Sequence, residues 1–313
     1  MRHYIHSTVL LALLALCLPI SARETNSRVG TSSFPFLKIN VSARAVGMGG
    51  AFTGLADDAS ALYYNPAGIA SYSDKQFVAG YHNYFVDIQS GFVAYTTPVT
   101  ERLYIGAWAS YLNFGEFIET NISGDIIDNF SGGDLMTAFT VALKHNRSFS
   151  YGGTVKAIYE KVHDFSASGI AVDLAVKYSS DRDRYSAGLM VQNLGRQLSA
   201  LGTEKYRLPL MVRAGGAMRP RSIPVVVAAD GIFMVDNNPV VALGIEYFEF
   251  QPFYARMGWN SFGSNYRGAD SDDVWAGFSM GVGFDHNQLH IAYAYSPAAD
   301  LGASHRATVT WSR

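Results

Sequence analysis

The side chains in this sequence that could do chemistry are few, and their spacing matches no familiar catalytic motif. His163 is close to Ser166 and Ser168, and a histidine beside a serine can activate it as a nucleophile. No carboxylate stands at a spacing that would orient this histidine, and GxSxG, HExxH, P-loop and Rossmann motifs are absent. The sequence therefore indicates a protein that is not an enzyme.

A glycine-rich stretch over residues 34–70 offers two further kinds of site, each with a structural alternative. Gly47, Gly49 and Gly50 could cradle a phosphate, but they follow no buried strand and lack the Lys-Ser/Thr ending of a phosphate loop. Asp57 and Asp58 could bind a cation, whereas a helix cap or hydrogen bonds to a surrounding wall would use the same carboxylates. The structural alternatives are favoured, so we expect no metal and no cofactor.

The composition excludes one class of partner. The chain has 313 residues, with 24 Lys and Arg against 26 Asp and Glu. A net charge this close to zero gives no electrostatic basis for binding nucleic acid. The only cysteine, Cys17, lies in the leader, so the mature chain has no disulfide and no cysteine-based metal site.

The first 22 residues have the features of an export signal. A basic start at Arg2 precedes an apolar run over residues 9–18 and a small-residue cleavage site ending at Ala22. We therefore expect residues 1–22 to be a cleaved signal peptide. The polar residues 23–33 are expected to form a flexible lead-in on the periplasmic side.

Alternation with a period of two residues dominates the chain after Gln76. Within residues 169–178, Ile170, Val172 and Leu174 share one face, and small or charged residues share the other. One face is thus compatible with lipid and the other with a polar interior, as in a transmembrane β-barrel. We expect about fourteen strands, over residues 76–84, 87–98, 101–114, 134–146, 149–163, 167–180, 184–195, 209–219, 222–236, 239–249, 252–262, 272–285, 287–297 and 305–312.

The lengths of the connections support an outer-membrane barrel. If the first strand runs outward, the long connections 115–133, 196–208, 263–271 and 298–304 all face the cell exterior. Short turns such as 146–148 and 181–183 then face the periplasm, which is the known asymmetry of such barrels. The predicted fold class is an all-β, antiparallel transmembrane barrel in the outer membrane of a Gram-negative cell.

A barrel of this size has a lumen too wide for wall side chains to fill. We therefore expect residues 34–75 to form a plug, or hatch, inside a barrel that comprises residues 76–313. The plug motif consists of charged, small and turn-forming residues: Arg44, Gly47, Gly49, Gly50, Asp57, Asp58, Asn65, Pro66 and Gly68.

Charged residues on the polar face should point into this lumen. The candidates are Lys156, Glu160, Asp173, Lys177, Arg213, Glu246, Arg256 and Arg306. An isolated ion is costly to bury, so they should pair with one another, with the plug or with water. A network that anchors the plug is favoured over a permeation pathway, and Arg44 should pair with a wall carboxylate such as Asp173 or Glu246.

Residues 36–70, FLKINVSARAVGMGGAFTGLADDASALYYNPAGIA, resemble the N-terminal signature of the PorV/PorQ family, within the FadL-like outer-membrane barrels. Residues 292–311, AYAYSPAADLGASHRATVTW, resemble the closing hairpin of that family. The resemblance implies a part in type IX secretion, with secretion-system components or the C-terminal domains of cargo as partners at the external loops.

Two rival functions remain open. A FadL-like transporter of hydrophobic compounds would need an apolar pocket beneath the external loops and a kinked wall strand. Glycines within residues 274–284, or Gly152 and Gly153, are candidate kinks. A purely structural barrel is the other rival.

Overall fold

The computed structural model describes residues 26–84, 88–180, 184–266, 275–298 and 302–313. The expected signal peptide therefore lies outside the described residues. No helix in the described part of the chain is long and apolar enough to span a membrane.

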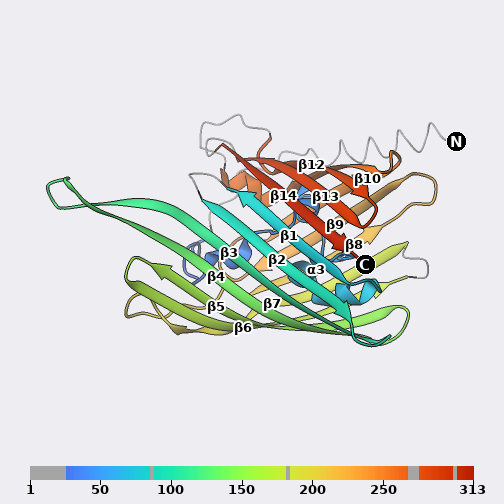
Figure 1. The fold of residues 1–313 in the computed structure, drawn as a ribbon, viewed down its shortest axis with the longest axis horizontal. Helices are drawn as coiled ribbons and strands as arrows, with labels where there is room; N and C mark the ends of the chain where they lie inside the picture. Colours follow the sequence, from blue (N-terminus) through green and yellow to red (C-terminus); the bar gives the residue numbers. More distant parts are fainter. Residues whose placement is uncertain (1–25, 85–87, 181–183, 267–274, 299–301) are drawn as a thin grey trace.

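Fourteen strands form a closed antiparallel barrel in which consecutive strands are neighbours and β1 pairs with β14 (Figure 1). Closure leaves no strand edge unpaired around the wall, as a membrane-spanning sheet requires. The predicted fold class is thus confirmed. The strands are β1 Gln76–Asn83, β2 Gln89–Pro98, β3 Leu103–Thr120, β4 Ile126–Lys144, β5 Phe149–Val162, β6 Phe165–Ser179, β7 Tyr185–Ser199, β8 Met211–Met218, β9 Val225–Met234, β10 Val240–Tyr247, β11 Phe253–Asn260, β12 Phe278–His286, β13 Leu289–Pro297 and β14 Ala303–Ser312.

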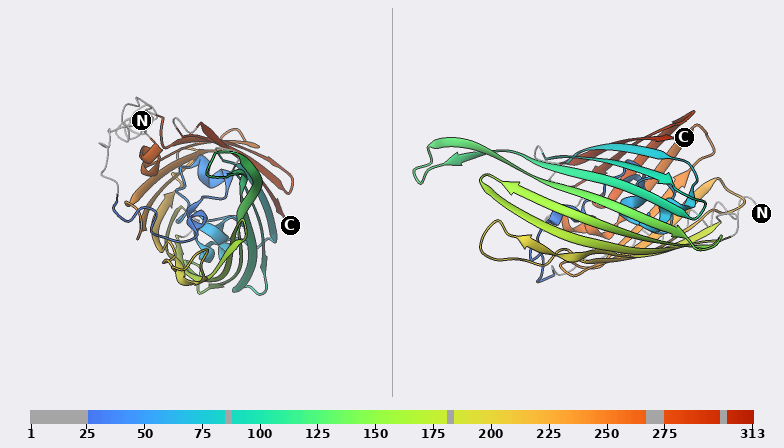
Figure 2. Two further views of the ribbon diagram at one scale, coloured as in Figure 1. Left: turned by 90° about the vertical axis from the view of Figure 1, so that its left-hand side faces the viewer. Right: turned by 60° about the horizontal axis from the view of Figure 1, so that its bottom comes forward.

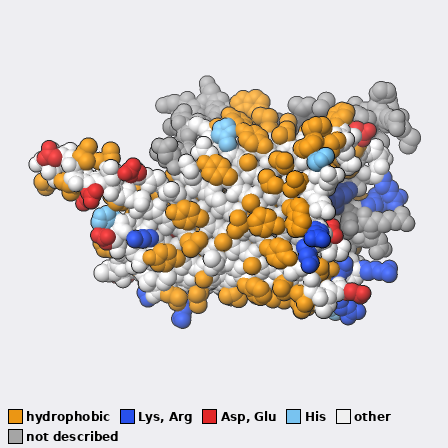
Figure 3. All heavy atoms as spheres, viewed as in Figure 1, with side chains coloured by type: hydrophobic (Ala, Val, Ile, Leu, Met, Phe, Trp, Pro, Cys, Tyr) orange, Lys and Arg blue, Asp and Glu red, His pale blue; other side chains and the backbone are white. Residues whose placement is uncertain are grey.

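The apolar rows of the wall point outward, as expected. In β6, Ile170 and Leu174 are 44% and 54% exposed, whereas Asp173 between them is 0% exposed. The same alternation recurs around the barrel, and Figure 3 shows hydrophobic side chains spread over its outer wall. Such a surface would be an aggregation hazard in water but is the natural outer face of a barrel in lipid.

The wall is much taller on one side than on the other. β4 has 19 residues and β3 has 18, whereas β8 and β10 have 8 each. The ends of β3 and β4 project beyond the barrel as a long hairpin (Figures 1 and 2). The expectation of a loop over residues 115–133 is therefore wrong, because residues 116–120 pair with residues 126–131 as strands.

A segment inside the barrel fills the lumen, and we call residues 34–71 the lumen segment (Figure 2). It contains the short helices η1 Pro35–Lys38, α2 Ala43–Gly47, α3 Ala61–Tyr64 and η2 Pro66–Ser71. α2 packs against β11 to β14, and η2 packs against β3 to β6. Most of its side chains are buried, including Phe34, Phe52 and Tyr64 at 0% exposure.

Glycine-to-glycine contacts let this segment approach the wall closely. Gly49 has a φ of +68°, and a Cβ there would lie 2.6 Å from the backbone N and O of Trp259. A Cβ at Gly258, on the facing strand, would overlap the backbone of Gly49. Small residues over this stretch therefore allow close packing of the backbone against the wall.

The lumen segment runs along the barrel from one end to the other. Ser33 N donates a hydrogen bond to Arg207 O (2.9 Å) at the end that bears the β3–β4 hairpin, which we call the hairpin end. At the opposite end, the turn end, Lys75 and Arg313 exchange two backbone hydrogen bonds of 2.9 Å.

This course conflicts with one expectation. Residues 26–33 cannot be periplasmic if the connection containing Arg207 is external, because Ser32 and Arg207 form a β-bridge. Residues 26–33 thus lie at the hairpin end, so the expected periplasmic lead-in and the expected external connection 196–208 exclude each other.

Candidate functional site

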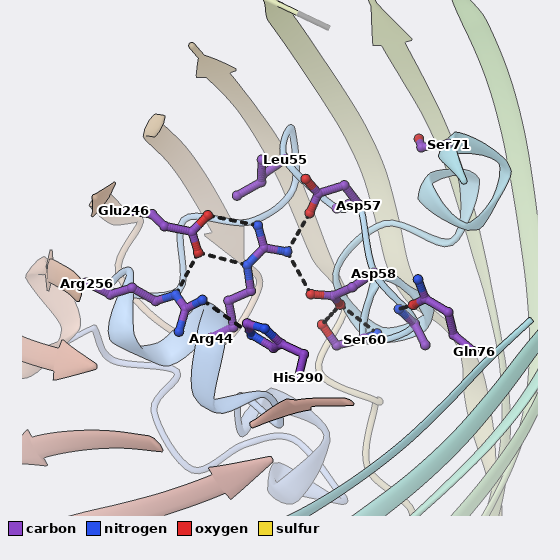
Figure 4. A network of polar contacts seen from close by, with 12 residues as sticks. Arg44, Leu55, Asp57, Asp58, Ser60, Ser71, Gln76, Glu246, Arg256 and His290 are labelled. Carbon is purple, nitrogen blue, oxygen red and sulfur yellow. Dashed lines mark hydrogen bonds and ion pairs between the residues drawn. The ribbon is translucent and has the colours of Figure 1, made fainter. Parts of the chain in front are cut away.

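Arg44 lies at the centre of an ionic cluster that joins the lumen segment to the wall (Figure 4). Its Nε and Nη2 donate to Glu246 of β10 over 2.9 and 3.0 Å. Its Nη1 donates to Asp57 (2.6 Å) and Asp58 (2.9 Å) of the lumen segment itself. A bidentate pair of this kind fixes orientation as well as charge. Of the two wall carboxylates expected to pair with Arg44, the partner is Glu246.

Two further arginines complete the cluster. Arg256 Nε, on β11, donates to Glu246 over 2.6 Å, and Arg219 Nη2, just beyond β8, donates to Asp57 over 2.7 Å. Arg256 also approaches His290, which contacts Asp285 at the turn end. The cluster thus holds three guanidinium groups against three carboxylates, so its charges balance.

Arg44 and Asp57 of the lumen segment remain charged in this cluster. Burial disfavours the charged form of Arg44, but Asp57, Glu246 and Asp58 hold its pKa well above the usual value. Burial would raise the pKa of Asp57, but Arg44, Arg219 and Lys177 hold it below the usual value. The cluster therefore keeps its ion pairs at neutral pH.

The remaining residues of the plug motif shape the lumen segment. Asp58 Oδ1 accepts hydrogen bonds from the backbone N–H and the hydroxyl of Ser60, which makes it a local cap. Asn65 caps η2 by accepting from Ala67 N, and its Nδ2 donates to Thr53 O and to Val176 O of the wall.

Pro66 begins η2, and a Cβ at Gly68 would overlap Ala56 O. Gly47 faces Gly281 of β12, and Gly50 has a φ of +87°.

Most of the lumen charge candidates are buried and face inward. Lys156 and Asp173 form an ion pair of 2.7 Å, at 1% and 0% side-chain exposure. Lys177 Nζ donates to the carbonyl oxygens of Leu55 and Ala56 over 2.7 Å each. Arg306 Nη1 donates to Ser304 Oγ, and Glu160 is only half-buried.

A β-bulge supports the Lys156–Asp173 pair. The pairing of β6 with β7 shifts between Val172 and Leu174, and Asn193 in β7 has a φ of +63°. Asn193 N donates to Asp173 Oδ1, and Lys156 Nζ donates to Asn193 Oδ1. The extra residue in β7 thus lets the amide side chain of Asn193 point into the lumen.

The strands that carry the candidate kinks pair without a register shift. β5 pairs continuously through Gly152 and Gly153, and β12 pairs without a shift over residues 278–286. Described register shifts occur only in the β3–β4 and β6–β7 pairings. The described pairings therefore show no bulge at Gly152, at Gly153 or within residues 278–286.

Sequence reasoning missed several contacts between the lumen segment and the wall. Asp230 Oδ2 accepts from the backbone N–H groups of Phe52 (3.0 Å) and Thr53 (2.8 Å), and Lys38 pairs with Asp236 over 2.7 Å. Asp230 lies on the inward face of β9 and could have been found by alternation. Asp236 lies outside any strand, so the sequence gives no signal for its direction.

The serine and histidine singled out for possible catalysis are not paired with each other. Ser168 Oγ hydrogen bonds to Ser199 Oγ over 2.8 Å. His163 lies 3.1 Å from Asp164 and 3.7 Å from Glu119, near the base of the hairpin.

A cavity of about 460 Å³ lies between the lumen segment and the hairpin end of the barrel. Its apolar lining includes a cluster of Met211, Ile232, Met234, Val240 and Phe262 from the β8–β11 side. Its charged lining residues are Lys38, Asp134, Arg213 and Arg306. The volume lies within the range of about 300–1,000 Å³ that is typical of small-molecule sites.

The projecting hairpin carries an unusual surface. Ile122 at its tip is 107% exposed, and Ile118, Ile126 and Ile127 are 61%, 68% and 59% exposed. Residues 115–131 include four acidic residues, Glu116, Glu119, Asp125 and Asp128, and no lysine or arginine. Exposed apolar side chains mixed with charges of one sign are typical of an interaction surface.

Comparison with known proteins identifies related sequences and folds. The family model described as "Type IX secretion system protein PorV" matches residues 22–219. No match is found among curated proteins. The toluene transporter TbuX of Ralstonia pickettii has a similar structure, with a TM-score of 0.62 and 12% identity over 88% of this chain and 99% of its own.

Other solved structures share the fold. A deletion mutant of the monoaromatic hydrocarbon channel TodX has a TM-score of 0.63 and 14% identity, over 88% of this chain and 99% of its own. A FadL homologue from Pseudomonas aeruginosa has a TM-score of 0.52 and 12% identity, over 87% of this chain and 97% of its own. At these identities, the likeness establishes a FadL-like barrel fold.

Proposed function

The chain belongs to the family of type IX secretion system protein PorV, and we propose from this that it takes part in protein secretion at the outer membrane. The family match carries the proposal, because it covers the lumen segment and the wall as far as the end of β8. The barrel acts as a scaffold in the outer membrane, and a signal peptide over residues 1–22 directs its export.

The hairpin over residues 115–131 is the proposed recognition element. Four exposed isoleucines there offer apolar contact, and the acidic side chains add selectivity for basic surfaces. The proposed partner is a secretion-system component or the C-terminal domain of a cargo protein. The connection 200–210 and the described residues 261–266 and 275–277 lie at the same end of the barrel and contribute to the contact.

The lumen segment is proposed to act as a plug. Its ion pairs, its close glycine contacts and its hydrogen bonds to Asp230 hold it against the wall over most of its length. A plugged barrel conducts no protein through its own lumen, so secretion through this barrel is not part of the proposal.

Transport of hydrophobic small molecules is a second candidate function. The apolar cluster of Met211, Ile232 and Val240 in the cavity at the hairpin end favours it. The FadL-like fold is compatible with it.

Deleting the gene and measuring the surface proteome tests the secretion role. Loss of proteins that carry type IX C-terminal domains is the expected result, and re-expression of the full chain should restore them. A chain in which Ile118, Ile122, Ile126 and Ile127 are all replaced by Ser should fail to restore them. Unchanged surface display in the deletion strain, together with slower growth on a hydrocarbon, would instead support transport.

A further inference from the structure

The projecting hairpin is a two-stranded ribbon whose outer edges pair with no other strand of the described chain. β2 pairs with β3 only as far as Asn113, and β5 pairs with β4 only as far as Gly132. Beyond these points, residues 116–120 and residues 126–131 pair only with each other (Figures 1 and 2). Native proteins usually cover or shorten such edges, because their unpaired backbone groups recruit other chains.

Two backbone hydrogen bonds determine which residues of β3 face the free edge. Ser131 O accepts from His163 N, so the backbone of Ser131 points away from β3. Residues directly opposite each other in an antiparallel pair face the same way relative to the ladder, so the backbone of Glu116, opposite Ser131, points away from β4. Asn121 N donates to Asp125 O, so residue 121 faces into the hairpin.

The outer edge of β3 therefore presents a row of backbone groups at alternate residues. Because the direction of N–H and C=O alternates along a strand, these are Glu116, Ile118 and Thr120, which we call the β3 edge. All three residues are exposed, and none of their backbone groups has a hydrogen bond to another part of the described structure. The β3 edge can thus accept a further strand.

The opposite edge of the hairpin is partly closed. Asn129 lies directly opposite Ile118, and its N–H is bonded to Asp128 Oδ1 over 2.8 Å. Ser131 O is occupied by His163 N over 3.2 Å. The β4 side thus uses backbone groups within this chain, whereas the β3 edge leaves them available for a partner.

The charge of the hairpin restricts which strand can be added. Its charged residues are all acidic, so the hairpins of two copies repel each other. A strand with Lys or Arg beside apolar side chains is attracted instead. Glu116 and Ile118 lie two residues apart on one face of the ribbon, so such a strand can meet both at once.

We propose that a partner protein adds an extended, basic strand to the β3 edge. Its backbone pairs with that of Glu116, Ile118 and Thr120, its apolar side chains contact Ile118, and its Lys or Arg side chains approach Glu116. The identity of the partner rests on the proposed secretion role, whereas the mode of binding rests on the geometry of the edge.

Proline tests the edge in the full-length protein, because Ile118→Pro removes an N–H that the ladder of the hairpin does not use. A photoreactive residue in place of Ile122 reports capture of the partner in living cells. Ile118→Pro should lower the yield of crosslinked partner about tenfold, whereas Ile118→Ala and Asn129→Pro should retain it. Full capture by Ile118→Pro, or equal loss in Asn129→Pro, would overturn the proposal.

Peptide titration separates this inference from the secretion role. Full-length barrel in detergent is titrated by calorimetry with a capped peptide of alternating Lys and Val, KVKVKVK. The controls are the same peptide with N-methyl groups on two adjacent central residues, which block both of its edges, and the acidic peptide EVEVEVE. The basic peptide should bind, and each control should bind at least about tenfold more weakly.

The outcomes of the two experiments are distinct. Binding of the basic peptide without any secretion partner crosslinked at position 122 would refute the secretion role but support strand addition at the β3 edge. Equal binding of the three peptides, or no binding of the basic peptide at millimolar concentration, would overturn strand addition whatever partner is crosslinked.

Discussion

Replacing Arg44 with Gln should release the lumen segment from the wall while leaving the barrel folded. The barrel ladder does not include Arg44, whereas the segment depends on it for contacts with Glu246, Asp57 and Asp58. The variant isolates the ionic cluster because glutamine preserves a polar side chain without the charge.

The free-energy cost of Arg44→Gln can be estimated from the cationic partners that each carboxylate of the cluster retains. Glu246 retains Arg256 and Asp57 retains Arg219, so only Asp58 loses its cation entirely. Breaking a buried ion pair on one side costs about 3–5 kcal/mol, and the retained partners place this case near 3 kcal/mol. That corresponds to roughly a hundredfold shift toward the undocked segment.

Hydrogen exchange measures this shift directly. Phe52 N and Thr53 N are bonded to Asp230 in the docked segment, so their exchange should accelerate by roughly a hundredfold in the variant. The exchange of β6 amides should not change. Arg102→Gln, which removes an exposed arginine from a turn, is the matched control.

A double variant checks the ionic reasoning. Adding Glu246→Gln to Arg44→Gln should cost much less than the sum of the two single effects, because the pair is removed together. Unchanged exchange in Arg44→Gln, or strictly additive effects in the double variant, would refute the proposed role of the cluster.

Three other changes test separate parts of the structure. Gly49→Ala should also accelerate hydrogen exchange in the lumen segment, because the added Cβ would lie 2.6 Å from backbone atoms of β11. Gly30 has a similar positive φ but open space around it, so Gly30→Ala should not accelerate exchange. Leu174→Arg on the lipid-facing wall should destabilise folding into vesicles by about 2–4 kcal/mol, as read from heat-modifiable gel mobility, whereas Ile122→Arg at the hairpin tip should have little effect. The pKa of Asp57 is lowered in the folded protein, so Asp57 stabilises the lumen segment fully above its unfolded pKa of about 4, and this stabilisation is lost as the pH falls further. Hydrogen exchange in the lumen segment, corrected for intrinsic rates, should therefore rise below about pH 4, and it should rise less in Asp57→Asn. A flat pH profile would contradict this.

Alternation was enough to predict the wall and the direction of its side chains. Each strand of the wall has lipid on one face and the lumen segment on the other, so apolar and polar side chains alternate along the strand. Ile170 on the lipid face and Asp173 on the lumen face are examples. The need to neutralise Arg44 also follows from the sequence. The choice of Glu246 over Asp173 does not, because Lys156 competes for Asp173 through a register that the sequence does not show.

The hairpin was missed for a physical reason. Residues 115–131 project beyond the barrel, so neither face of the hairpin meets lipid or the lumen segment. Ile126 and Ile127 are adjacent and both exposed, which erases the alternation used to find strands. Asn193 was missed for a related reason, since the extra residue of a bulge interrupts the period.

Photo-crosslinking from the hairpin tip in living cells tests the proposed secretion role most directly. A photoreactive residue in place of Ile122 should form crosslinks to secretion-system proteins or to cargo carrying type IX C-terminal domains. The same residue in place of Phe139, on the lipid-facing wall of β4, should form none of these crosslinks. Absence of such partners at position 122, or the same products at both positions, would contradict recognition by the hairpin.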